Sequence, residues 1–156
     1  MAMAAGLATL AVFDDEKLVE RAADVGERLI ANLRRRLSGF EFVKDVRGKG
    51  LMIAVEFGPP KSLKLRAAYA MLDKANKGLF CQLITVPLFK DHKILTQVSG
   101  HGSHTIKLLP PLVITEEDCN WIEKAFDDVI AASHKVPGAI WSLGKTLVDN
   151  AVRKSA

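Results

Sequence analysis

Apolar and polar residues repeat with two different periods along this chain, and each period predicts a kind of element. After residue 14, apolar positions recur every three or four residues and form one stripe, which predicts a helix of about five turns. Its members are Leu18, Ala22, Val25, Leu29, Leu33 and Leu37. Asp14 or Asp15 is expected to cap its start, and Arg34, Arg35 and Arg36 complement the helix dipole at its end. We interpret the arginines as a solvated helix terminus rather than a phosphate site.

A second amphipathic stripe follows Thr115, with Asp118 three positions further on. This spacing is typical of a capped helix start, in which the Thr115 hydroxyl and the Asp118 carboxylate satisfy free backbone amides. The stripe comprises Cys119, Ile122, Phe126, Val129 and Ile130. Residues 139–156 are expected to form one more helix.

Alternation with a period of two predicts strands at residues 40–46 and 51–57. Between them lies Arg47-Gly48-Lys49-Gly50, whose glycines can take positive φ, so a β-hairpin with a tight connection is expected. Two short strands, 93–100 and 105–111, flank the stretch "GHGS". The second ends at a double proline, which cannot donate hydrogen bonds to a sheet.

Helices are expected to fill the remaining segments. Residues 63–78 form a helix closed by Gly78, and residues 79–92 have helical apolar spacing despite Pro87. Residues 1–13 are Ala-rich and apolar on all sides. A helix of that kind needs a neighbour that buries it, and no other segment obviously does so. The predicted fold class is α+β, a small antiparallel sheet covered by helices.

Composition narrows the function classes. The net charge of +4 is too small, without clustering on one face, to indicate nucleic-acid binding. No apolar run reaches the roughly 18 residues of a membrane span, and the N-terminus lacks the features of a secretory signal. Cys81 and Cys119 lie in apolar surroundings without metal-like spacing, which favours buried thiols and a cytoplasmic location.

Two cations are candidates for function. Lys107 interrupts an apolar strand, where a solvated edge lysine is the ordinary interpretation. Arg47 lies in the hairpin connection, either as a structural residue or as one that touches a substrate. His101 and His104 in "GHGSH" lack a third ligand nearby, so no metal site is expected; that loop is a candidate lining for a substrate entrance.

Three stretches together resemble one family. "MAMAAGLATL", "VRGKGLMIAVEF" and "ILTQVSGHGSHTIKLLPPLVITEED" occur in the order and spacing of class III aminotransferases. That pyridoxal-phosphate family includes ornithine, acetylornithine and putrescine aminotransferases. The resemblance covers residues 1–134 and implies the C-terminal small domain of a fold-type I enzyme.

The resemblance also implies what this chain lacks. In the family, the Schiff-base lysine, the acid that pairs with the pyridine nitrogen and the phosphate-binding loop belong to a large domain upstream. No catalytic or cofactor-binding residue is therefore expected here, and the chain alone is expected to be inert and free of cofactor. The expected protein partners are that large domain and, in the full-length enzyme, a second copy of the chain in a homodimer. The expected small-molecule partners are an amine and a keto acid. We expect residues 1–13 to contact the large domain, residues 14–134 to form the small domain, and residues 135–156 to form a helical extension.

The resemblance also places Lys107 where family members acting on α-amino acids carry a carboxylate-binding arginine. Arginine clamps a carboxylate at two points, whereas lysine offers a flexible point charge. The change favours a donor that reacts at a terminal amine, such as an ω-amine, a diamine or ornithine. Arg47 matches the family's hairpin arginine. The alternative is a free-standing interaction or regulatory module that keeps this fold without the chemistry.

Overall fold

The computed structural model describes residues 2–75 and 77–135. Within these ranges the elements are α1 (Ala2–Asp15), α2 (Leu18–Leu37), β1 (Val43–Lys49), β2 (Met52–Phe57), α3 (Leu63–Ala75), α4 (Leu79–Lys90), β3 (Gln97–Val98), β4 (Thr105–Leu108) and α5 (Glu116–His134). The predicted α+β class is confirmed. The helix expected at 139–156 lies outside the described residues.

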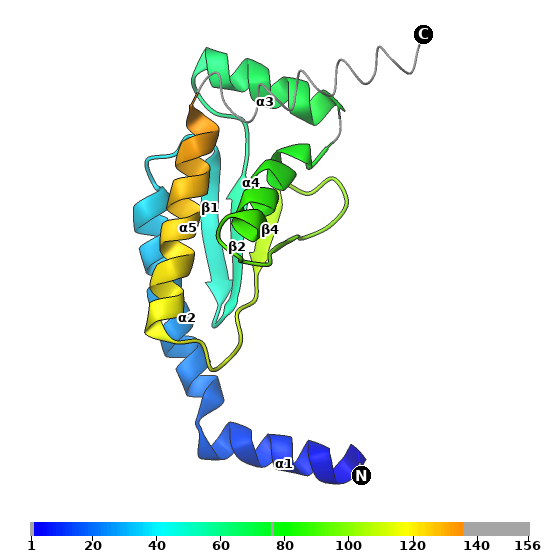
Figure 1. The fold of residues 1–156 in the computed structure, drawn as a ribbon, viewed down its shortest axis with the longest axis vertical. Coiled ribbons are helices and arrows are strands. Elements are labelled where there is room, and N and C mark those ends of the chain that lie inside the picture. Colours follow the sequence, from blue (N-terminus) through cyan, green and yellow to red (C-terminus); the bar gives the residue numbers. More distant parts are fainter. Residues whose placement is uncertain (1, 76, 136–156) are drawn as a thin grey trace.

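The four strands of the described part form one antiparallel sheet in the order β1-β2-β4-β3. One face of the sheet is the core face, because Val46, Val55 and Ile106 lie opposite one another across three strands and are all buried. Helices α2 and α4 contact the strands, and α5 packs against both helices (Figure 1). The other face carries exposed or partly exposed side chains.

The hairpin differs from the prediction in its register. Strand β1 runs on to Lys49, which pairs with Met52, so the turn is Gly50-Leu51 and Arg47 lies inside the strand. Gly50 has a φ of 54°, the left-handed conformation that glycine tolerates. The turn rests on α2, where a Cβ on Gly26 would lie 2.1 Å from the carbonyl oxygen of Gly50. Contact with a helix distant in sequence therefore determines where the chain reverses.

The junction between the first two helices also departs from the prediction. Helix α1 continues through Asp15, beyond the predicted end at residue 13, and neither Asp14 nor Asp15 caps α2. The N-cap is Lys17, at a φ of 49° and without a side-chain cap. This left-handed residue breaks the helix and turns α1 away from the rest of the molecule (Figure 1). None of the residues of α1 is buried.

The middle of the chain agrees in type but differs in length. Helix α3 ends at Ala75, short of the predicted 78, and Gly78, at a φ of 84°, precedes α4. The helical prediction for residues 79–92 is confirmed, with Pro87 inside α4. The strand expected at 93–100 shrinks to Gln97–Val98, because only this stretch lies opposite β4, whose own partner residues are Ile106 and Lys107.

Helix α5 begins as predicted. The Asp118 amide donates to the Thr115 hydroxyl over 3.1 Å, and the Thr115 amide donates to the Asp118 carboxylate over 3.2 Å. The Thr115 hydroxyl also donates to the Asp118 carboxylate, over 2.6 Å. The two bonds that this carboxylate accepts lower the pKa of Asp118 from its usual value, the one from the hydroxyl contributing most.

Candidate functional site

The two candidate cations share one face of the sheet. Arg47 on β1 is paired with Ala54 on β2, and Ala54 is paired with Lys107 on β4. Residues paired across antiparallel strands point to the same face, so Arg47 and Lys107 flank the small side chain of Ala54. This face is the one opposite the buried row, and the site therefore opens away from the core.

Arg47 is already engaged by two carboxylates. Its Nη1 donates to Asp45 over 3.2 Å and makes a short contact with Glu56. These contacts raise the pKa of Arg47 above its usual value, the hydrogen bond to Glu56 contributing most. Its side chain is 49% exposed. The charge of Arg47 is thus balanced within the protein before any ligand arrives.

Lys107 has the opposite character. It is partly exposed, and within residues 2–75 and 77–135 no carboxylate forms an ion pair with its ammonium. The residues paired with it, Ala54 and Gln97, carry no charge. On this face of the sheet, Lys107 offers an ammonium that can receive an external anion.

The strand that carries Lys107 is anchored at both ends. Before it, the Tyr69 hydroxyl lies 3.1 Å from Nδ1 of His104, while Nε2 of His104 lies 3.2 Å from Asp73. Burial and the nearby Asp73 raise the pKa of Tyr69 to about 12, so the hydroxyl keeps its proton. His104 is thereby tied to α3, whereas His101 is exposed; the role of this loop at a substrate entrance stays a prediction.

After the strand, Arg21 of α2 holds the exit that follows the double proline. Its guanidinium donates to the carbonyl of Ile114 over 2.6 Å and to that of Leu112 over 3.2 Å. Ile114 itself is buried. The position of Lys107 is therefore defined by contacts from α2 and α3, and sequence reasoning had attached no role to Arg21, Tyr69 or Asp73.

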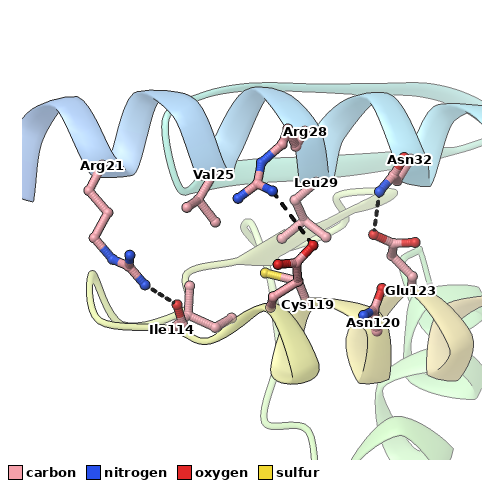
Figure 2. Close-up of a pocket in the computed structure, with 10 residues that line it drawn as sticks. Arg21, Val25, Arg28, Leu29, Asn32, Ile114, Cys119, Asn120 and Glu123 are labelled. Atoms are coloured by element: carbon pink, nitrogen blue, oxygen red, sulfur yellow. Dashed lines mark hydrogen bonds and ion pairs between the residues drawn. The ribbon is translucent and has the colours of Figure 1, made fainter.

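A second polar cluster lies between α2 and α5, around a pocket of about 160 Å³ (Figure 2). Its centre is Glu123, only 2% exposed, which accepts a hydrogen bond from Asn32 over 2.8 Å and one from Arg36 over 3.0 Å. Arg34 also has an internal partner, the carbonyl of Val46 at 2.6 Å. All three arginines are exposed in the last turn of α2, as predicted for a solvated helix terminus, although Arg34 and Arg36 also bind groups of other elements. Arg34 binds strand β1 and Arg36 binds helix α5, and residue spacing within α2 gives no signal of either contact.

The two cysteines are buried free thiols, as predicted. Burial raises the pKa of Cys81 to about 12, and it raises the pKa of Cys119 as well. A thiol with a raised pKa is a poor nucleophile. In the described ranges no three His, Cys, Asp or Glu side chains gather as metal ligands, and no described helix is long and apolar enough to cross a bilayer.

Comparison with known proteins identifies the family. The profile of the family described as aminotransferase class-III matches residues 1–130. The chain is 36% identical over 125 residues to a diaminobutyrate–2-oxoglutarate aminotransferase of Rhizobium meliloti, an alignment covering 80% of this chain and 26% of that protein. Among solved structures, ornithine aminotransferase from Plasmodium yoelii matches with a TM-score of 0.60 and 31% identity, over 80% of this chain and 28% of that one. An amine transaminase from an uncultivated Pseudomonas species, in its PLP-bound form, matches with a TM-score of 0.62 and 26% identity, over 82% and 26%.

The chain belongs to the class III aminotransferase family. It spans about a quarter of the length of the relatives it matches. The resemblance inferred from the three motifs is therefore confirmed at the level of the family, whose enzymes use pyridoxal phosphate.

The described residues do not fit that cofactor by themselves. Each of three surface pockets within this part of the chain is bordered by two carboxylates, which repel a phosphate. The first pocket has Glu116 and Glu123, the second Asp91 and Asp128, and the third Glu117 and Asp118. The two arginines of the first pocket are already used, since Arg21 binds backbone carbonyls and Arg28 pairs with Glu116 at 3.7 Å. Pyridoxal phosphate supplies the electron sink of aminotransfer.

Proposed function

We propose that this chain is the small domain of a pyridoxal-phosphate-dependent aminotransferase, in which Lys107 binds a substrate carboxylate. One observation carries the proposal: among the described residues no anion pairs with the Lys107 ammonium on the open face of the sheet, while Arg47 beside it is already paired. An unpaired ammonium can form a charge-assisted hydrogen bond with a carboxylate. The anchors on either side of β4 support the proposal, because they define the position of the strand that carries Lys107.

The proposed amino donor carries a terminal amine, as an ω-amine, a diamine or an ornithine-like compound does, and the acceptor is a keto acid. Support comes from the relatives, whose names denote diaminobutyrate with 2-oxoglutarate in one case and ornithine in the other. Both of these donors carry two amino groups. A lysine at position 107 holds a carboxylate less rigidly than arginine, which suits a site that must accept a keto acid and then a chemically different amine.

We further propose that residues 2–13 contact the large domain of the same enzyme. Met3, Leu7 and Leu10 are each more than 60% exposed on α1. Apolar side chains gathered in this way are typical of a surface that another part of a protein covers.

The test is substitution of Lys107 in the intact aminotransferase, with the two half-reactions measured separately in single turnovers. Lys107→Ala is expected to slow the keto-acid half-reaction about tenfold in kcat/KM, which corresponds to about 1.4 kcal/mol. The diamine half-reaction should change little, because a diamine brings no carboxylate to this end of the pocket. Lys107→Arg should preserve diamine turnover and improve donors that carry an α-carboxylate by a similar factor.

The matched control is Lys49→Ala, which removes an exposed lysine from the same face of the sheet at the hairpin end. It should leave both half-reactions unchanged. Equal loss in both half-reactions of Lys107→Ala would mean that Lys107 maintains the strand rather than binding substrate. No loss in either would make it a solvated edge lysine.

A further inference from the structure

Glu56 lies between the two candidate cations. It is paired with Asp45 on β1 and with Thr105 on β4. On the same face, the adjacent row holds Arg47 on β1 and Lys107 on β4. Glu56 therefore has one cation diagonally to each side, and such diagonal neighbours lie about 7–8 Å apart, within reach of long side chains.

The carboxylate of Glu56 pairs with Arg47 and not with Lys107. It contacts Arg47, and no ion pair joins it to Lys107 in the described part of the chain. Arg47 also bonds Asp45, so a single guanidinium holds both carboxylates that face each other across β1 and β2. Like charges in directly opposed positions repel, and Arg47 offsets this repulsion.

Removing the guanidinium would leave Lys107 as the cation in the row adjacent to Glu56 within the described part of the chain. Asp45 would repel the Glu56 carboxylate from the β1 side, and Lys107 would attract it from the β4 side. β1 carries two further cations. The amine of Lys44 donates to the carbonyl of Glu41 over 3.2 Å, and Lys49 is one row further away because it is paired with Met52. A Glu56–Lys107 pair would neutralise the ammonium that the proposed function requires.

We propose that Arg47 is a positioning residue: by holding Glu56 toward β1, it keeps the Lys107 ammonium free for the substrate carboxylate. This inference rests on the proposed function of Lys107 and assigns a second residue to the specificity of the same site. Arg47 itself does not contact the substrate.

Zero-length cross-linking of this chain tests the geometry directly. A water-soluble carbodiimide activates the Glu56 carboxylate, the Lys107 amine displaces the urea, and an amide forms as the carbodiimide takes up the lost water. Arginine does not react as an amine, so the Arg47–Glu56 contact gives no product. Tryptic peptides joined through Glu56 and Lys107, quantified by mass spectrometry, report how often the two groups meet.

Arg47→Gln is expected to raise the yield of this cross-link roughly two- to fivefold, the population change that an exposed ion pair produces. Arg47→Lys should restore a low Glu56–Lys107 yield and give a new cross-link between Glu56 and the amine at position 47. Lys49→Gln, the matched control, should not alter the yield. Far-UV circular dichroism of each variant checks that the fold is kept.

An unchanged yield in folded Arg47→Gln overturns the proposal, as does a Glu56–Lys107 cross-link already abundant in the unsubstituted chain. In the intact enzyme, Arg47→Gln should raise the KM for the keto acid roughly two- to fivefold with little change in kcat, and adding Glu56→Gln should reverse the effect. A rise that persists in the double variant also overturns the proposal. The carboxylate role of Lys107 fails by a separate criterion, namely unaltered half-reactions in Lys107→Ala.

Discussion

The contact between α2 and α5 includes an ion pair between Arg36 and the buried carboxylate of Glu123. Replacing Arg36 alone should lower the free energy of unfolding far more than replacing both partners. The side chain of Glu123 is 3% exposed, whereas that of Arg36 is 40% exposed. Arg36→Met leaves a buried negative charge with Asn32 as its only partner among the described residues. Losing a hydrogen bond to a charged group costs about 1.5–3 kcal/mol, and the free energy of unfolding should fall by about 2–3 kcal/mol.

Glu123→Met should cost less, about 1 kcal/mol or below, because Arg36 can turn into solvent and the methionine fills the space. Replacing a buried ion pair by apolar residues of similar volume is often neutral. The double variant Arg36→Met/Glu123→Met should therefore resemble Glu123→Met alone, with a coupling energy of about 2–3 kcal/mol in magnitude between the two sites.

The assay is urea unfolding followed by circular dichroism, with the free energy extrapolated to water. Arg35→Met is the matched control, since Arg35 belongs to the same triplet and, within the described ranges, its side chain donates to Asn32 alone, over 3.0 Å at an exposed position. It should cost less than about 0.5 kcal/mol. The reasoning is refuted if Arg36→Met is no more destabilising than this control, or if the losses of the two single variants simply add.

Two further predictions concern the hairpin turn and the start of α5. Gly26→Ala should destabilise the fold by about 3 kcal/mol or more in the same urea assay, because the added Cβ would lie 2.1 Å from the Gly50 carbonyl oxygen. The control is Gly6→Ala, whose added Cβ would meet no heavy atom of the described residues within 4 Å beyond its chain neighbours and the backbone of its own helix, and it should be neutral or slightly stabilising. Because the bonds from Thr115 lower the pKa of Asp118, their stabilisation is complete above the usual aspartate pKa of about 3.9 and is lost as the pH falls through the lowered value. Asp118→Asn should therefore reduce stability at pH 6 and flatten its decline below about pH 4, whereas a decline as steep as that of the unsubstituted chain would contradict this cause.

Local patterns in the sequence determined the type of most elements. The three-to-four spacing of α2 and α5 follows from covalent helix geometry, which places those positions on one side whatever surrounds them. The Thr115–Asp118 cap likewise depends on groups three residues apart. The three motifs, taken together in their order along the chain, indicated the family that the comparison then confirmed.

Tertiary structure decided where the hairpin turns. Alternation indicates that two strands exist, but their register depends on what they pack against. Gly26 of α2 receives the Gly50-Leu51 turn, and this contact places Arg47 inside β1. The burial of Glu123 has the same kind of cause. Its sequence neighbours, Ile122 and Lys124, give no sign that it is buried, because its hydrogen-bond partners Arg36 and Asn32 belong to α2.

Tertiary structure also distinguished the two candidate cations. The sequence alone indicated Arg47 and Lys107 as positive charges near a sheet, 60 residues apart (107 − 47). Cross-strand pairing places both beside Ala54 and places Asp45 and Glu56 within reach of Arg47. Contacts between strands decide which of the two cations is left without an ion pair in the described part of the chain. Ion pairs form between groups that strand pairing brings together, and the order of residues along one strand does not specify which strand lies beside it.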